Sequence, residues 1–194
     1  MTIDIAEAPA GAAGPDLADL VALFDLPLAH ARYNESVTQL EHALQCGWLA
    51  HRAGAGDELA AAALLHDVGH MLTVTGPRTG RPTGDLRHED AGAAFLARWF
   101  GPRVTGPVSL HVAAKRYLCA TDPAYLAILS AGSDHSLGLQ GGPMSAIECE
   151  AFERLDGWEG AVELRRWDDL AKRPGAVCAP LEDWWPVLER LTHR

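Results

Sequence analysis

The sequence places two metal-binding residue types side by side, His66 and Asp67, in an otherwise apolar stretch from Ala62 to His70. Burying a carboxylate beside an imidazole is unfavourable unless strong hydrogen bonds or a bound cation compensate for the lost water. His70 follows His66 by four residues, so the two imidazoles share one face of a helix. The spacing indicates a metal site. The simpler alternative is an amphipathic helix with three ionisable groups on its polar face.

Further metal-binding residue types occur in other predicted helices. They are His42, His88, His111 and Asp168. Ligands spread over several helices are typical of a metal site in a bundle core, and a chance distribution of histidines is the alternative. Four imidazoles with two carboxylates suit zinc, iron, copper or nickel better than magnesium or calcium. Six ligands exceed the needs of one open catalytic ion, so we predict two metal ions bridged by Asp67.

Two cations lie one helical turn from these candidate ligands. Lys115 follows His111 by four residues, and Arg165 precedes Asp168 by three. A cation beside a metal ion is repelled unless an anion lies between them. The two pairs therefore predict an anionic substrate, and Arg with Lys suits the oxygens of a phosphate or phosphonate. Exposed ion pairs are the alternative.

The bulk properties narrow the classes of protein that fit. With 194 residues, 48% of them hydrophobic and 22% charged, the chain fits one soluble globular domain with a sizeable core. A net charge of -10 argues against a nucleic-acid partner, which would require a basic face. The chain shows no secretory leader, no membrane-spanning apolar stretch and no Cys-x-x-Cys pair. We therefore expect a cytoplasmic protein with reduced cysteines and no membrane partner.

Hydrophobic periodicity and capping signals predict an all-α fold, with a single domain over residues 16–194 and a disordered tail over residues 1–15. Two overlapping capping boxes, Ser36 with Gln39 and Thr38 with Glu41, precede one of the helices. Glycines and prolines predict loops over 73–85 and 138–143. The predicted helices cover residues 16–26, 36–54, 57–72, 86–100, 106–118, 122–131, 145–155, 157–172 and 181–193.

Four stretches resemble the mixed-valent diiron oxygenases of the HD-domain superfamily, which cleave the carbon-phosphorus bond of 1-hydroxyalkylphosphonates. The stretches are 39–46, 62–70, 111–118 and 140–144. The resemblance covers about residues 31–175, and the last two stretches are more specific than the His-Asp pair. It implies an all-α HD-domain bundle with a dinuclear iron site in its core, and O2 as the co-substrate.

The resemblance also implies a role for each candidate residue. One iron would be bound by His42, His66 and Asp168, the other by His88 and His111, with Asp67 as the bridge. The phosphonate would be held by His70, Lys115, Ser133 and Arg165, with Gln140 nearby. The family carries a mobile Tyr-x-x-Glu pair that guards the open iron position. Here the sequence is Tyr33-Asn34-Glu35, so Glu35 matches the pattern and Tyr33 is displaced by one residue. We assign catalytic roles to His66, Asp67, Glu35 and Tyr33.

The expected reaction uses O2 and an Fe(II)/Fe(III) pair to release inorganic phosphate from a small zwitterionic phosphonate. The substrate would be 2-amino-1-hydroxyethylphosphonate, giving glycine, or its N-trimethylated counterpart, giving glycine betaine. A primary amine favours a carboxylate such as Glu35, whereas a trimethylammonium group favours aromatic faces such as Tyr33 and Trp48. One alternative is an HD-type phosphohydrolase, in which a metal-bound hydroxide attacks a phosphate ester. Another is a metal-binding or sensing module without catalysis.

Overall fold

The computed structural model describes residues 16–33, 36–72 and 87–192. Within these ranges the chain forms helices and no β-strand, with two isolated bridges at Arg32 to Thr38 and Phe100 to Thr192. The predicted all-α class is confirmed. The helices are α1 (Leu17–Val21), α2 (Gln39–Arg52), α3 (Asp57–Leu65), α4 (Val68–Leu72), α5 (His88–Leu96), α6 (Pro102–Thr121), α7 (Pro123–Ala127), α8 (Ala131–Leu139), α9 (Ala146–Phe152), α10 (Trp158–Leu170), the 3-10 helix η1 (Leu181–Trp184) and α11 (Trp185–Leu191).

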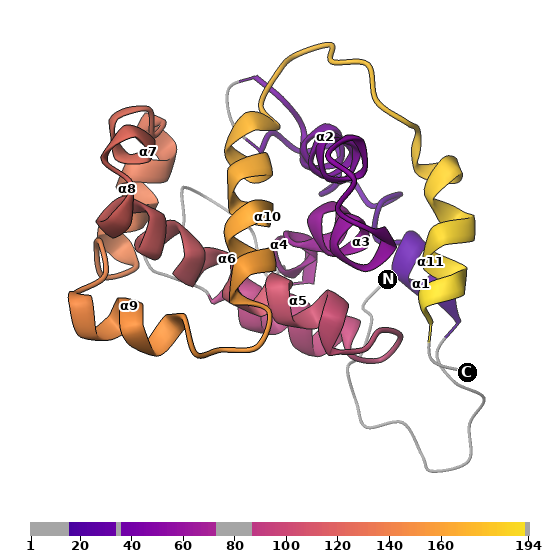
Figure 1. Cartoon of the computed structure of the whole chain (residues 1–194). Helices are drawn as coiled ribbons and strands as arrows, with labels where there is room; N and C mark the ends of the chain where they lie inside the picture. The colour runs from indigo at the N-terminus through magenta and orange to yellow at the C-terminus, as the bar shows by residue number, and fades with distance from the viewer. Residues whose placement is uncertain (1–15, 34–35, 73–86, 193–194) are drawn as a thin grey trace.

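Four helices form the centre of the bundle: α2 packs on α3, α6 packs on α10, and both α2 and α3 contact α10. Figure 1 shows α7, α8 and α9 at one end of the molecule, and α1 and α11 at the other. Apolar side chains such as Leu64, Leu65, Leu96 and Leu164 fill the space between the central helices. Polar groups that point into this apolar region need partners that offset the loss of water.

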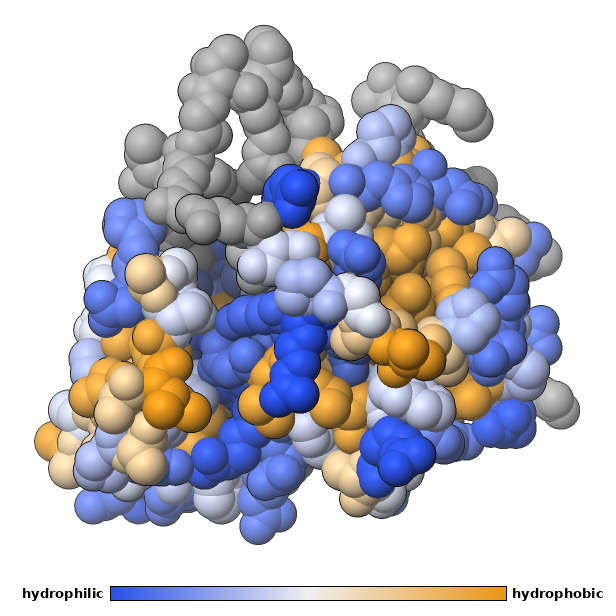
Figure 2. Space-filling model, turned by 90° about the horizontal axis from the view of Figure 1, so that it is seen from above, coloured by the Kyte–Doolittle hydropathy of each residue, from blue (hydrophilic) through white to orange (hydrophobic). Residues whose placement is uncertain are grey.

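The surface carries both hydrophilic and hydrophobic residues. On the face shown in Figure 2, hydrophilic residues surround several clusters of hydrophobic ones. Among the described helices, none combines the length and the apolar composition that crossing a lipid bilayer requires.

Local capping interactions explain several helix starts. The predicted Thr38–Glu41 box is present, with Thr38 Oγ1 accepting from the Glu41 N–H and the Glu41 carboxylate accepting from the Thr38 N–H. It starts α2 at Gln39, one turn before His42. At α7, Asp122 accepts from the N–H groups of the second and third helical residues, as the Asp-Pro signal predicts.

The predicted helix over 57–72 is wrong in one respect that matters for the site. The structure contains two helices, α3 and α4, and His66 and Asp67 lie in the break between them. The Asp67 carbonyl accepts from the N–H of His70, three residues on, so the backbone tightens after α3. The carboxylate of Asp67 therefore leaves the backbone at a break and not from a regular helix face.

Two other predicted boundaries also differ. The helix predicted over 106–118 begins at Pro102, because Pro107 removes one intrahelical bond without ending the helix. The helix predicted over 122–131 ends at Ala127, and Ser130 caps a further helix, α8, that extends into the predicted loop over 138–143. The predicted loop over 73–85 lies outside the described residues.

Candidate metal centre and anion pocket

The two carboxylate oxygens of Asp67 face two different sets of imidazoles. Oδ2 lies 3.7 Å from His42 Nε2 and 3.4 Å from His66 Nε2. Oδ1 lies 3.4 Å from His88 Nε2 and 3.7 Å from His111 Nε2. The break after α3 thus places one carboxylate between two groups of nitrogen atoms, the arrangement that a carboxylate bridging two cations requires.

The first cluster consists of His42, His66 and Asp168, which come from α2, the end of α3 and α10. His42 Nε2 lies 3.4 Å from Asp168 Oδ1, and His66 Nε2 lies 3.9 Å from Asp168 Oδ2. All three residues are at most 1% exposed. Three metal-binding groups from distant parts of the chain therefore meet inside the core.

The second cluster consists of His88, the first residue of α5, and His111 in the middle of α6. Their Nε2 atoms lie 3.1 Å apart. Two ligand nitrogens about 2.1 Å from one ion are separated by about 3.0 to 3.4 Å, so the pair has the spacing of two ligands on a shared cation. His88 and His111, together with Asp67, could hold a metal ion.

Backbone carbonyls orient three of these imidazoles. Because a carbonyl only accepts, the bonded Nδ1 carries the proton and the Nε2 lone pair points into the site. Nε2 of His66 is buried and has no hydrogen-bond partner among the residues that the structure describes, which is the feature expected of a nitrogen prepared for a cation. The three bonds run from His42 Nδ1 to Ala171 O (2.8 Å), from His66 Nδ1 to Ala63 O (2.8 Å) and from His111 Nδ1 to Val108 O (2.7 Å).

The electrostatic environment favours the metal-binding forms of most of these groups. Burial lowers the pKa of both His66 and His111, which keeps their imidazoles neutral. Burial raises the pKa of Asp67, but His66 and His70 outweigh burial and lower it below its usual value. His42 is the exception, because Cys46 and Asp168 overcome the effect of burial and raise its pKa. A metal ion at the first cluster therefore competes with a proton on His42.

Tyr33 lies in the site although it is displaced from the family pattern. Its ring stacks on that of His42, with a centroid distance of 3.8 Å and an interplanar angle of 9°. Its hydroxyl donates to Asp168 Oδ1 at 3.3 Å. Burial, followed by the charges of Asp168 and Asp67, raises the pKa of Tyr33, so the phenol stays a donor. Glu35 lies outside the described residues, and its role stays a prediction.

The predicted anion-binding residues adjoin the two clusters. Arg165 Nη1 donates to Asp168 Oδ2 at 2.5 Å, and Nη2 lies 3.5 Å from Ser133 Oγ. Lys115 is 3% exposed, and its Nζ donates to Ser136 Oγ at 2.6 Å. On the other side, His70 Nε2 lies 3.8 Å from Asp67 Oδ1, and the His70 ring stacks on that of His88 at 3.9 Å.

Gln140 is the predicted residue with the least support. It forms the C-cap of α8, and its side-chain Oε1 is buried without a hydrogen-bond partner among the described residues. No hydrogen bond of its side chain reaches Ser133 or Arg165 in the part of the chain that the structure describes. Its predicted place near the phosphonate stays a prediction.

The structure adds three residues to the anion pocket, which we define as Lys115, Ser133, Arg165, Asp169, Lys172 and Tyr125. Asp169 accepts hydrogen bonds from Arg165, Lys172 and Tyr125. The spacings from Arg165 to Asp169 and from Asp169 to Lys172, four and three residues, were visible signals in the sequence. Tyr125 had no such signal, because it reaches Arg165 from a separate helix 40 residues away.

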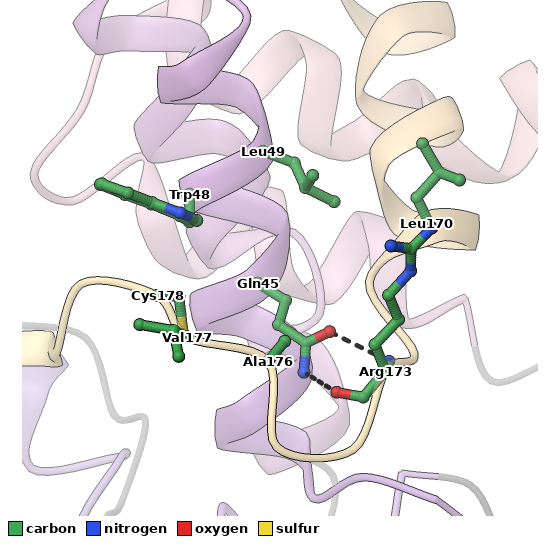
Figure 3. Close-up of a pocket in the computed structure, with 8 residues that line it drawn as sticks. All are labelled: Gln45, Trp48, Leu49, Leu170, Arg173, Ala176, Val177 and Cys178. Atoms are coloured by element: carbon green, nitrogen blue, oxygen red, sulfur yellow. Dashed lines mark hydrogen bonds between the residues drawn. The ribbon is translucent and has the colours of Figure 1, made fainter.

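A separate pocket lies between α2 and the segment after α10, and it contains Trp48 (Figure 3). Gln45 lines it and forms two hydrogen bonds with the backbone of Arg173, at 3.0 and 3.1 Å. These bonds brace the segment whose Ala171 carbonyl orients His42. Trp48 stacks on His51 and lines this pocket, so it is not one of the residues that surround the two clusters.

Similarity to known proteins identifies the family of this chain. The model of the HD domain matches residues 40–130. The hydroxymethylphosphonate dioxygenase of Gimesia maris is 44% identical over 173 residues, which are 88% of this chain and 86% of the relative. The 1-hydroxy-2-(trimethylamino)ethylphosphonate dioxygenase (glycine-betaine-forming) of Leisingera caerulea is 41% identical over 165 residues, which are 82% of both chains. The predicted family is confirmed, and the chain belongs to the phosphonate dioxygenases of the HD-domain family.

Proposed function

We propose that the chain uses two iron ions and O2 to cleave the carbon-phosphorus bond of a small 1-hydroxyalkylphosphonate. The observation that carries the proposal is the position of Asp67 between two imidazole clusters, near the buried cations Arg165 and Lys115. Both relatives described above are named as dioxygenases of hydroxyalkylphosphonates. The cations of the anion pocket suit the phosphonate group of such a substrate.

The first cluster would hold one iron and the second cluster the other, with Asp67 between them. Two imidazoles and one carboxylate, the composition of the first cluster, are the ligand set that non-haem iron oxygenases use. When bound, the iron pair supplies the redox chemistry that allows O2 to oxidise the substrate carbon. Tyr33 supports the first cluster by covering one face of the His42 ring and donating to Asp168.

The chain's own residues would bind and orient the phosphonate. Lys115, Ser133 and Arg165 offer donors on the α6, α8 and α10 side, and His70 offers a ring nitrogen beside Asp67. Arg165 contacts both Asp168 and Ser133, so a phosphonate bound there lies next to the first cluster. The reaction balances with one O2 per substrate: the hydroxylated carbon becomes a carboxylate, and the phosphorus leaves as inorganic phosphate.

We infer that the substrate bears a primary amine or a trimethylammonium group on the carbon that follows the hydroxylated carbon. A trimethylammonium group favours open aromatic faces, and Tyr33 is an aromatic residue beside the first cluster. One face of Tyr33 is covered by His42, and Lys172 Nζ lies 6.0 Å from the same ring centroid. Both features weaken a cation–π contact between Tyr33 and a trimethylammonium group, so we favour the primary amine. Hydroxymethylphosphonate, which has no nitrogen, is the third candidate.

The test measures O2 uptake and phosphate release with iron-loaded protein and each of the three phosphonates. We expect equimolar O2 uptake and phosphate release with at least one of them, and no phosphate release under argon. Hydrolysis of phosphate esters under argon, without O2 uptake on any phosphonate, would show a phosphohydrolase instead. Iron binding without turnover of either substrate class would show a silent module.

A further inference from the structure

We propose that Asp169 is a positioning residue that holds the cations of the anion pocket in the geometry that binds the phosphonate. Asp169 lies in the last turn of α10, one residue after Asp168. The inference rests on the proposed function, since the anion in question is the phosphonate of its substrate. The hydrogen bonds of its carboxylate run to Arg165, Lys172, Ser133 and Tyr125, and it acts through these residues.

Three donors converge on one oxygen of Asp169. Its Oδ1 accepts from Arg165 Nη2 at 2.6 Å, from Lys172 Nζ at 2.8 Å and from Ser133 Oγ at 3.3 Å. An oxygen of a phosphonate would bind the same kinds of donor, a guanidinium, an ammonium and a hydroxyl. One carboxylate thus gathers donors from α8, α10 and the segment after α10 around a single point.

The carboxylate of Asp169 also determines which N–H groups of Arg165 remain to bind an anion. Arg165 Nε and Nη2 donate to Asp169 at 3.0 and 2.6 Å, and Nη1 donates to Asp168 at 2.5 Å. A guanidinium has five N–H groups, so these bonds leave one on Nη1 and one on Nη2. The Nη2 atom lies 3.5 Å from Ser133 Oγ. Asp169 therefore directs two N–H groups of Arg165 towards the region between Ser133 and Asp168.

Tyr125 completes this arrangement from α7. Its hydroxyl donates to Asp169 Oδ2 and accepts from Arg165 Nε at 3.0 Å. Burial is the largest influence on the pKa of Tyr125 and raises it, which keeps the hydroxyl a donor. Tyr125 therefore fixes Asp169 and Arg165 relative to each other from outside α10.

Charge and positioning predict opposite effects for the loss of Asp169. The carboxylate of Asp169 forms ion pairs with Arg165 and Lys172, and as an anion it repels another anion. If only the negative charge of Asp169 mattered, removal of that charge would strengthen anion binding. If positioning decides, loss of the carboxylate charge weakens anion binding, because Arg165 and Lys172 lose the ionised acceptor that holds them together.

The experiment compares Asp169→Asn with Asp134→Asn, which removes the same charge from an exposed position on α8. Binding of inorganic phosphate and of hydroxymethylphosphonate to iron-loaded protein is measured by calorimetry under argon, with iron content and melting temperature recorded for each variant. We expect Asp169→Asn to bind both anions about tenfold or more weakly, the effect of losing one charge-assisted contact. Asp134→Asn should stay within about twofold of the wild type, as surface changes do. In turnover, KM should rise more than kcat falls, and Asp169→Glu should recover part of the affinity.

Anion binding by Asp169→Asn that equals or exceeds that of the wild type would overturn the inference. If this variant does not fold, Tyr125→Phe tests the same network, because it removes the hydroxyl that links Asp169 to Arg165. It should weaken phosphate binding about threefold, and unchanged binding would again overturn the inference. Wild-type protein that binds phosphate but consumes no O2 with any hydroxyphosphonate would refute the proposed function only.

Discussion

The two clusters around Asp67 are held in different ways. His42, His66 and Asp168 of the first cluster are at most 1% exposed and come from the helices that form the core. In the second cluster, His88 is 8% exposed and begins α5, a helix that lies against α4. The first cluster is part of the hydrophobic core, whereas the second depends on the packing of α5 against α6 and, at His88 itself, on the contact between α4 and α5. The second ion position should therefore be easier to lose without unfolding the chain.

Gly69 shows how close that contact is. A Cβ atom at Gly69 would lie 1.9 Å from the carbonyl oxygen of His88, and one at Gly92 would lie 3.2 Å from the Gly69 nitrogen. Only a residue without a side chain permits this approach of the two backbones. The position of His88 thus depends on a glycine that carries no chemistry of its own.

The largest expected effect comes from Asp67→Ala, which removes the carboxylate that lies between the two clusters. We expect the loss of both irons and a fall in kcat of more than about a hundredfold. Loss of a residue that only orients a metal ligand costs up to about a hundredfold, and loss of a ligand should cost more. Iron analysis and O2 uptake check this result, with Asp134→Asn as the control. Two retained irons would contradict the bridging role.

Gly69→Ala should damage the second cluster alone. Because the new Cβ displaces the backbone at His88, we expect about one iron per chain, and activity reduced about tenfold or more. The matched control is Gly138→Ala in α8, where an added Cβ meets nothing within 4 Å. Iron content equal to that of the wild type would show that α5 adjusts and that the two clusters are equally robust.

Arg165→Ala acts on the pocket beside the first cluster. The variant should retain its iron, while KM for the phosphonate rises about tenfold to a hundredfold because a charge-assisted contact is lost. The neighbouring Arg166→Ala is the control, since Arg166 is exposed and pairs with Asp122. Loss of iron in Arg165→Ala would mean that Arg165 chiefly supports Asp168.

The smallest expected effect is a pH dependence from Lys115, which lies outside both clusters. Burial, with a further contribution from Arg165, lowers the pKa of Lys115 to about 8. The ammonium is present below that value and is lost as the pH rises through it, so KM should rise several-fold above about pH 8. Lys115→Arg keeps its charge at these pH values and should abolish the rise. A rise that persists in Lys115→Arg would assign the titration to another group.

The sequence predicted a helical segment around each candidate ligand, and a capping box and amphipathic periodicity explain two of these predictions. His42 follows the Thr38 capping box, and Asp168 lies in the amphipathic α10. The break at His66 and Asp67 could not be predicted, because the apolar pattern continues across it and tertiary contacts decide the backbone path. Tyr125 was missed for a related reason, since its contact with Arg165 spans 40 residues.

The anchors of the imidazoles differ in kind from those of the anion pocket, and this affects how the protein tolerates mutation. His42, His66 and His111 are oriented by main-chain carbonyls, which any amino acid at positions 171, 63 and 108 would still provide. The pocket is held by side chains, so one substitution at Asp169 removes several contacts together. Sequence drift can therefore retune which anion is bound while the orientation of the imidazoles persists.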